Sequence, residues 1–368
     1  MNQKHQKTGL FLVVCVWLAL SLLAFFGPKE SYSLSERREL AEKPDWSIRE
    51  VWKGTFMEEF DAYSLDQFPF RDSFRRLKAR MQYGIFQQQD NNGIYFYQDH
   101  IVKMEYPYRE ASVTHALKRF RYLYDRYLGD TKGALVFAVV PDKGYYAGAE
   151  SGHLQMDYGR LLSALQKGMP EAEVVDLTDM LSLADYYRTD PHWKQENLFG
   201  AAKKIASALE IEPPREADYR KEELSTPFSG AYAGQAALPF PEDRITLLRN
   251  DLLDQCLVYD YETGTTGSIY ERKKEKGKDP YEVYLKGARA LLTITNPNAR
   301  EPERELLVFR DSFGSSLVPL LLSEYHKVTL VDIRYIHPNL IGNYVEQKDR
   351  DVLFLYSTTV LNHSETLK

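Results

Sequence analysis

Apolar residues along this chain form short continuous runs, separated by segments in which they recur at helical spacing. The continuous runs are typical of strands buried on both faces of a sheet, and the spaced segments predict helices with one apolar face. The runs are Ala134–Val140, Val174–Leu177, Leu306–Phe309, Val328–Ile333 and Val352–Tyr356, and the helical segments include 113–127, 161–165 and 197–209. Helices that alternate with buried strands favour an α/β fold with a mainly parallel sheet.

One of these strands leads directly into a serine. Arg310-Asp311-Ser312-Phe313-Gly314 follows Leu306–Phe309, and Leu317, Leu320, Leu321 and Tyr325 then recur at helical spacing. Ser312 is therefore predicted at a strand-to-helix turn, where open α/β sheets carry their chemistry. Gly314 would relieve crowding in the turn, and backbone N–H groups at the helix start could stabilise an oxyanion beside a nucleophilic serine. The alternative is that Asp311 and Ser312 are ordinary turn and cap residues.

A second stretch, Tyr187–Trp193, carries an Asp-x-His pair. Asp190 and His192 would project to the same side of an extended segment, where the carboxylate can orient the imidazole and stabilise its protonated form. This is the arrangement of the base and its partner in a hydrolytic triad. For an isolated Asp-x-His pair, a loop histidine beside an aromatic residue is the commoner explanation.

Two further strand ends carry candidate side chains. Pro141-Asp142-Lys143 follows the strand over Ala134–Val140, so Lys143 could face a substrate, although a loop lysine is more often solvated. Arg334 and Tyr335 follow the strand over Val328–Ile333, so either could reach the same cleft. Arg334 could bind a carboxylate or support an oxyanion, and the alternative for it is a structural ion pair.

An uncharged apolar run over residues 10–27 sets the expected compartment. It is long enough to cross most of a hydrocarbon core of about 30 Å, and two lysines precede it, which favours an N-terminus inside the cell. We expect an uncleaved anchor rather than a signal peptide, because Ala24-Phe25-Phe26 is bulky where a cleavage site needs small residues. The sequence thus predicts a cytoplasmic tail over 1–8, a transmembrane anchor over 9–27 and an extracytoplasmic body at the cell membrane.

The body is expected in two parts, a lead-in over 28–100 that packs on the main body and an α/β domain over 101–368. The lead-in contains Asp72-Ser73-Phe74, which repeats the triplet around Ser312, but no buried strand precedes it. We therefore assign that triplet to structure, with Asp72 as a helix cap.

Two other segments complete this division of the chain. Asn92-Gly93 before Ile94–Tyr97 predicts a hairpin turn and a strand at the end of the lead-in. A stretch rich in Pro, Gly and charged residues, over about 213–300, is expected to be an insertion in the α/β domain that shapes the cleft.

Composition excludes several functions. The formal net charge is −6 at pH 7, and a mildly acidic exported body argues against nucleic acid as a partner. One of the two cysteines lies in the apolar run, so the predicted exported part cannot form an internal disulfide or a zinc site built on cysteines. No cluster of residues indicates a metal and no glycine-rich phosphate loop occurs, so we expect no metal and no cofactor.

The order of the motifs resembles the DHHW family. Asn-Gly-Ile-Tyr-Phe, Pro-Asp-Lys, Thr-Asp-Pro-His-Trp, Arg-Asp-Ser-Phe-Gly and Val331–Tyr335 follow one another from about Ser33 to the last strand. That family is similar to SGNH-hydrolase-type proteins such as the alginate O-acetyltransferases, which implies an SGNH-hydrolase-like three-layer sandwich. The resemblance implies Ser312 as nucleophile, His192 as base and Asp190 as its partner. Pro191 stands where the family motif has its first histidine, so no role carries over to that position.

The resemblance also implies a reaction. We expect serine-dependent O-acetyl transfer to a cell-surface or secreted polysaccharide, with the acetyl group supplied across the membrane by a multi-pass O-acyltransferase. A carbohydrate esterase is the first alternative, because the same triad can use water as the acceptor. A non-catalytic protein that binds glycan or scaffolds a polysaccharide machine is the second.

Overall fold

The computed structural model describes residues 3–129 and 131–368, which divide into two compact units. The smaller unit comprises the chain up to Asn91 together with Ala233–Pro239, and the larger unit comprises Asn92–Tyr232 and Phe240–Lys368. Residues 92–100, expected in the lead-in, thus belong to the larger unit.

A single long helix, α1 (Gln3–Phe26), precedes the rest of the smaller unit. Its segment Lys7–Phe26 is long and apolar enough to cross a membrane, and none of the residues in that segment is buried. Such a helix near the N-terminus is compatible with a single-pass anchor or with a signal sequence. Residues 1–2 of the predicted tail lie outside the described part of the chain.

Short helices make up most of the remaining smaller unit. They are α2 (Ile48–Lys53), α3 (Thr55–Asp66) and α4 (Arg71–Arg80), the last continued by a π-helical turn (Met81–Ile85), beside a small ladder of β1 (Tyr32–Ser33) and β2 (Arg38–Glu39). Gly54 has a φ of 84° and separates α2 from α3, because glycine adopts this left-handed conformation without steric cost. Phe70 occupies the N-cap position of α4, which places Asp72 inside the first turn rather than at the predicted cap.

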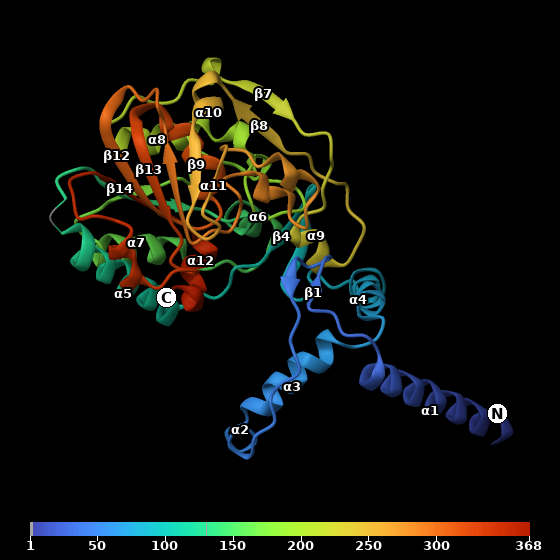
Figure 1. Ribbon diagram of the computed structural model, residues 1–368. Helices are drawn as coiled ribbons and strands as arrows, with labels where there is room; N and C mark the ends of the chain where they lie inside the picture. Colours follow the sequence, from blue (N-terminus) through green and yellow to red (C-terminus); the bar gives the residue numbers. More distant parts are fainter. Residues whose placement is uncertain (1–2, 130) are drawn as a thin grey trace. The chain divides into compact units, whose positions relative to one another are not determined.

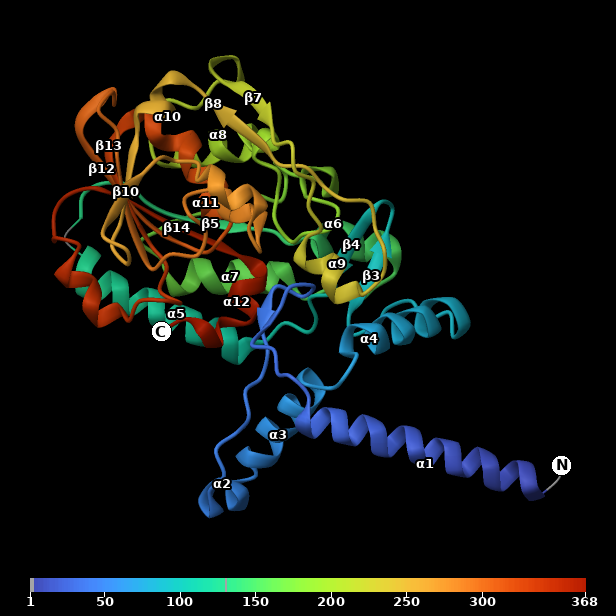
Figure 2. The ribbon, with the colours of Figure 1, turned by 45° about the vertical axis from the view of Figure 1, so that its right-hand side comes forward.

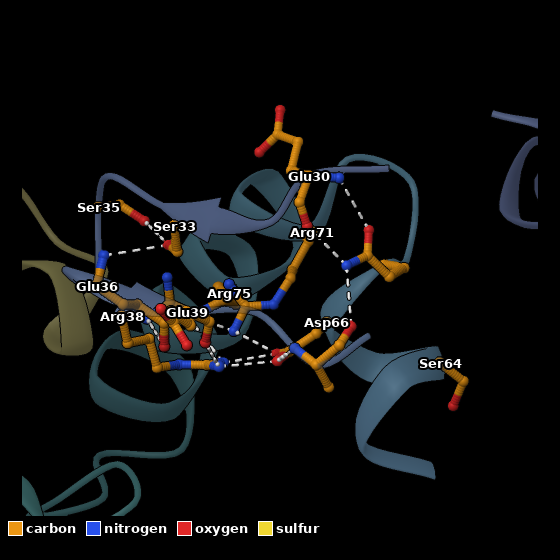
Figure 3. A network of polar contacts seen from close by, with 12 residues as sticks. Glu30, Ser33, Ser35, Glu36, Arg38, Glu39, Ser64, Asp66, Arg71 and Arg75 are labelled. Atoms are coloured by element: carbon orange, nitrogen blue, oxygen red, sulfur yellow. Dashed lines mark hydrogen bonds and ion pairs between the residues drawn. The ribbon is translucent and has the colours of Figure 1, made fainter. Parts of the chain in front are cut away.

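Ion pairs stabilise the smaller unit around two carboxylates (Figure 3). Asp66 accepts two hydrogen bonds from Arg38, at 2.8 and 2.6 Å, and this pairing lowers the pKa of the Asp66 carboxyl group. Glu36 pairs with Arg71 at 2.5 Å and with Arg75 at 3.2 Å. The charged residues of this segment therefore form a network.

The larger unit is built on an eight-stranded sheet of order β10-β9-β11-β13-β12-β14-β5-β6 (Figures 1 and 2). Its strands are β5 (Leu135–Val140), β6 (Glu173–Asp176), β9 (Leu257–Asp260), β10 (Thr265–Gly267), β11 (Leu291–Thr295), β12 (Glu301–Arg310), β13 (Tyr325–Val331) and β14 (Asp351–Ser357). The five strands from β13 to β6 are parallel, and β11, β9 and β10 continue the sheet in antiparallel pairings. The predicted mainly parallel sheet is confirmed.

Helices cover both faces of this sheet, because side chains alternate between two cores along each strand. On β5, Val136, Ala138 and Val140 contact the core that contains α8. Phe137 and Val139 contact the opposite core, which contains α5, α7 and α12. The helices concerned are α5 (Glu110–Leu123), α7 (Tyr158–Gly168), α8 (Phe199–Ala208) and α12 (Thr358–Asn362). The layers match the expected three-layer sandwich (Figure 1).

Further elements of the larger unit surround the sheet. The hairpin β3 (Ile94–Tyr97) and β4 (His100–Lys103) turns at Gln98-Asp99, whereas Asn92-Gly93 forms a separate turn before β3. The helix α6 (Lys143–Ser151) follows β5 directly. The remaining elements are β7 (Arg220–Glu223) paired with β8 (Thr246–Arg249), α10 (Asp251–Gln255) and α9 (Ala231–Ala236), most of which belongs to the smaller unit.

The region over 213–300 is more than an insertion between sheet strands. It supplies β9, β10 and β11, which extend the central sheet at its antiparallel edge.

The segment after Ser312 differs from the long helix that the spacing predicts. The helix α11 (Gly314–Leu317) is short and continues as a 3₁₀ helix over Val318–Glu324. Pro319 lies at the start of that 3₁₀ helix, and because it has no N–H group it interrupts the hydrogen-bond ladder of α11 at this point. Tyr325, expected on the helix, is the first residue of β13.

Candidate active site

Ser312, His192 and Asp190 form one hydrogen-bonded row at the carboxyl end of β12. The His192 Nε2 atom lies 2.7 Å from the Ser312 Oγ atom, and the His192 Nδ1 atom lies 2.6 Å from the Asp190 Oδ1 atom. The side chains of His192 and Asp190 are 12% and 2% exposed, so the aspartate end of the row is buried. The structure thus brings together the three residues predicted as a triad, although 120 positions separate the histidine from the serine.

The histidine loop is a tight turn rather than the extended segment we expected. Tyr187 and His192 join through a backbone hydrogen bond of 3.0 Å, and Asp190 Oδ1 also accepts the backbone N–H of His192 at 3.1 Å. An aspartate that accepts the N–H group two residues later makes an Asx turn. Pro191 lies at the centre of this turn. The turn aims the carboxylate and the imidazole at each other.

Two backbone N–H groups from the 213–300 region bind Asp190 and its neighbour Thr189. Ala231 N–H donates to Asp190 Oδ2 at 3.1 Å, and Gly230 N–H donates to Thr189 Oγ1 at 2.8 Å. A Cβ atom at Gly230 would lie 2.4 Å from the Asp190 Cβ atom, so only glycine allows this approach. No local pattern in the sequence connects residues 230–231 with Asp190, so the motifs alone could not predict this contact.

Lys143 is buried beneath the same loop instead of facing solvent. Its ammonium group donates to the carbonyl oxygens of Tyr187, Arg188 and Asp190 at 2.8, 3.1 and 3.1 Å. Burial lowers the pKa of the Lys143 amine to about 7, while three carbonyl acceptors favour its charged form. Lys143 therefore binds the backbone that carries Asp190, and neither sequence interpretation anticipated this position.

Asp311 and Gly314 shape the serine turn. Asp311 is fully buried and its carboxylate accepts the N–H groups of Phe313 and Ser357, at 3.0 and 2.7 Å. A Cβ atom at Gly314 would lie 2.9 Å from the Arg310 Cβ atom, so the glycine relieves crowding as predicted. The Gly314 N–H already donates to the Asp311 carbonyl at 3.2 Å, which commits that group within the turn.

The two candidates after β13 lie in different surroundings. Arg334 makes two hydrogen bonds to the buried Asp332 carboxylate, at 2.9 and 2.6 Å, which is the ion-pair alternative considered from the sequence. Tyr335 is 48% exposed, and the Arg334 guanidinium lies 5.4 Å from its ring centre. Arg334 is therefore engaged with Asp332 and Tyr335 rather than with the Ser312–His192–Asp190 row.

Aromatic residues enclose the imidazole. The ring of Tyr281 stacks on that of His192, with centroids 3.8 Å apart and planes 9° apart, and Phe313 contacts the imidazole at 4.9 Å. Trp193 is fully buried and packs edge-on against Phe313, so it fixes this loop against the core. Tyr281 has no signal in the sequence, because it lies in an irregular segment rich in tyrosine and charged residues.

This arrangement has the parts needed for nucleophilic catalysis, namely a hydroxyl, a base in hydrogen-bond contact with it and a carboxylate that orients the base. Within residues 3–129 and 131–368, no group of three or more His, Cys, Asp or Glu side chains is placed to hold a metal ion.

Solved structures share this fold. A DHHW family protein from Eubacterium siraeum matches with a TM-score of 0.59 and 21% identity, over 76% of this chain and 95% of that chain. Bacillus cereus PatB1 matches alone and with a sulfonyl adduct, with TM-scores of 0.58 and 0.56 and 18% identity in both, over 76% and 74% of this chain and 99% and 97% of PatB1. The O-acetyltransferase domain of Pseudomonas putida AlgJ has a TM-score of 0.44 and 14% identity, over 74% of this chain and 93% of that domain.

The predicted resemblance to a DHHW protein is confirmed at the level of the fold. The sequence matches no protein-family model, and no curated protein matches it.

Proposed function

We propose that this chain is a serine-dependent O-acyltransferase that moves an acetyl group to a hydroxyl of a cell-surface or secreted polysaccharide. The observation that carries the proposal is the row in which Ser312 Oγ, His192 and Asp190 follow one another at 2.7 and 2.6 Å. The fold shared with a DHHW family protein and with PatB1 supports it, as does the position of the serine at the carboxyl end of a central parallel strand.

In the first half of the reaction, Ser312 Oγ attacks the acetyl carbonyl of the donor. The serine proton passes to His192 Nε2, and Asp190 stabilises the resulting imidazolium through the Nδ1–H bond. The carbonyl π electrons move to oxygen, which becomes an oxyanion. We assign its stabilisation to the Ser312 N–H, which makes no hydrogen bond to the described residues. The intermediate then expels the donor's leaving oxygen, which takes the proton from His192, and acetyl-Ser312 remains.

In the second half, a sugar hydroxyl attacks the acetyl-serine. Its proton passes to His192 Nε2, the bond to Ser312 Oγ breaks, and the serine oxygen recovers the proton. Water in place of the sugar would give an esterase with the same residues.

The proposed setting is the outer face of a membrane. The apolar helix α1 would anchor the chain in a single span with its N-terminus inside, and the body would act extracytoplasmically. A multi-pass membrane O-acyltransferase would supply the acetyl group from inside the cell, and the polysaccharide would be the acceptor.

Intact-mass spectrometry tests the covalent step. The full chain in detergent is incubated with 4-nitrophenyl acetate, beside the variants Ser312→Ala and His192→Ala. We expect one added acetyl group on the wild-type protein, located at Ser312 by peptide mapping, and none on either variant. Ser73→Ala is the matched control, because Ser73 lies in the same Asp-Ser-Phe triplet on an exposed part of α4.

Equal labelling of the wild-type protein and Ser312→Ala would contradict the proposal, and so would the absence of any acetyl adduct or ester turnover. Acetyl release without a sugar acceptor at the rate seen with one would identify an esterase. Polysaccharide acetylation that survives Ser312→Ala in cells would indicate a scaffold.

A further inference from the structure

The ring of Tyr281 lies parallel to the imidazole of His192. The two ring centres are 3.8 Å apart and the planes differ by 9°, whereas Phe313 meets the imidazole at 52°. Tyr281 is 3% exposed, so the tyrosine ring covers one face of the imidazole and shields it from water. A π face stacked on a ring that becomes a cation stabilises that charge, and more so where water is excluded.

The hydroxyl of Tyr281 is bound to the serine turn itself. It lies 2.8 Å from Ser316 Oγ, which also receives the indole N–H of Trp193 at 2.8 Å. The indole N–H can only donate, so Ser316 Oγ accepts it. Ser316 Oγ also lies 3.4 Å from the carbonyl of Phe313. All three donors are satisfied when Tyr281 and Trp193 donate to Ser316 Oγ and Ser316 donates to that carbonyl.

These contacts close a ring of residues around the base. Ser312 binds His192, His192 stacks on Tyr281, Tyr281 binds Ser316, and Ser316 returns to Ser312 along the backbone of the turn. Two contacts therefore fix the imidazole relative to the serine turn. One is the hydrogen bond at its Nε2 atom, and the other is the stacking of Tyr281 on its ring face.

We propose that Tyr281 is a positioning residue, which holds the His192 ring in line with Ser312 Oγ and stabilises the imidazolium formed when the serine is deprotonated. This inference rests on the proposed function, because it assigns Tyr281 to the same reaction. Asp190 orients the ring edge through Nδ1, and Tyr281 fixes the plane of the ring. The region over 213–300, expected to be an insertion, thus supplies a residue of the proposed active site.

Two kinds of measurement on the full chain in detergent test this role. The first is the rate constant for sulfonylation of Ser312 by phenylmethylsulfonyl fluoride, followed by intact mass and divided by the folded fraction from circular dichroism. The second is the NMR signal of the His192 Nδ1 proton in protein labelled with ¹⁵N-histidine, which reports the Asp190 hydrogen bond without any reaction.

Three variants distinguish the effect of the Tyr281 ring from that of its hydroxyl and from a general loss of core packing. Tyr281→Leu removes the ring, and we expect sulfonylation to slow about ten-fold or more, with a shifted or broadened Nδ1 proton signal. Tyr281→Phe keeps the ring, and we expect a rate within about three-fold of wild type and a nearly unchanged signal. Tyr325→Leu is the control, because Tyr325 is equally buried but binds Asp351 at the opposite end of the sheet strands.

The outcomes distinguish this inference from the proposed function. A wild-type rate and an unchanged Nδ1 signal in Tyr281→Leu would overturn the role of Tyr281 while leaving the serine chemistry intact. Equal slowing in Tyr281→Leu and Tyr325→Leu per folded molecule would also overturn it. A wild-type protein whose serine is inert would overturn the proposed function, and the NMR comparison would still show whether Tyr281 orients the imidazole.

Discussion

The chain contains the triplet Asp-Ser-Phe twice, and the two copies lie in opposite kinds of environment. Asp72-Ser73-Phe74 lies in the first turns of α4, where the Asp72 side chain is 48% exposed and Phe74 is 44% exposed. Asp311-Ser312-Phe313 follows a central strand, where Asp311 is fully buried and Phe313 is 6% exposed. Identical residues therefore have different chemistry, because a buried strand end supplies partners that a surface helix lacks.

The two triplets differ in their hydrogen-bond partners. Around the first triplet, Asp72 Oδ1 lies 3.3 Å from Arg75 of the same helix and 3.3 Å from Ser35. Around the second, the serine meets a histidine and the aspartate accepts a backbone N–H from β14. The first set lies at the partly exposed start of α4, whereas the second joins a buried strand end to β14 and to the loop after β6.

The largest contrast is expected in reactivity. Ser312→Ala should lower acetyl transfer to Ser312 and ester turnover by at least about 1,000-fold, because the nucleophile is lost, whereas Ser73→Ala should leave both unchanged. Initial rates with 4-nitrophenyl acetate measure this. Comparable losses in the two variants would mean that burial at the strand end does not decide which serine reacts.

The next contrast concerns stability. Asp311→Ala leaves the buried N–H groups of Phe313 and Ser357 without an acceptor, so we expect it to lower the free energy of unfolding by about 3 kcal/mol or more. Asp72→Ala should change it by less than about 1 kcal/mol, because its ion pairs are partly solvated. Urea denaturation of both variants compares them, and a larger loss for Asp72→Ala would reverse the argument.

The contrast between buried and exposed carboxyl groups also predicts a pH dependence of stability, because the larger unit contains buried carboxyl groups such as Glu105. Burial, and then the nearby Asp142, raises the pKa of Glu105 to about 7 from 4.5, and Glu105 Oε2 lies 3.0 Å from the Nε2 atom of His363. A raised carboxyl pKa means that the folded state keeps its proton longer than the unfolded state. The free energy of unfolding should therefore fall by up to about 3 kcal/mol as pH rises from about 4.5 to 7, and stay lower above that range.

The matching variant for this test is Glu105→Gln, which mimics the protonated carboxyl group and should remove most of the pH dependence. Urea denaturation at pH 5 and pH 8 measures it. An unchanged pH dependence in the variant would assign the effect to other groups.

The smallest expected effect concerns the residue after the serine triplet. Gly314→Ala places a Cβ atom 2.9 Å from that of Arg310, so we expect a loss of about 1–3 kcal/mol and slower acylation. Gly159→Ala in α7 is the control, since its nearest contact would be an ordinary 3.5 Å, and it should be neutral or slightly stabilising. Equal stability of the two variants would show that the turn adapts freely.

Local patterns of apolar residues predicted much of the fold. The apolar runs predicted β5, β6 and β14 to within one residue at each end, because strands buried on both faces need continuous apolar sequence. The strands β12 and β13 were also predicted, but they begin earlier, at Glu301 and Tyr325. The same reasoning failed after Ser312, where leucines at helical spacing continue into a 3₁₀ helix and then a strand. The same spacing of apolar residues is compatible with an α-helix and with a 3₁₀ helix that leads into a strand. The α-helix ends here because Pro319 interrupts it and β13 begins at Tyr325.

The sequence by itself determined which residues are candidates, since a serine at a strand end and an aspartate two residues before a histidine can be recognised locally. Only the tertiary structure decided that they meet, because the contact depends on β12 lying centrally in the sheet and on the loop after β6 folding over its end. It also decided that Tyr281, Ala231 and Lys143 support them. Such contacts leave no periodic signal, because neighbours in space are set by strand order and loop paths rather than by spacing along the chain.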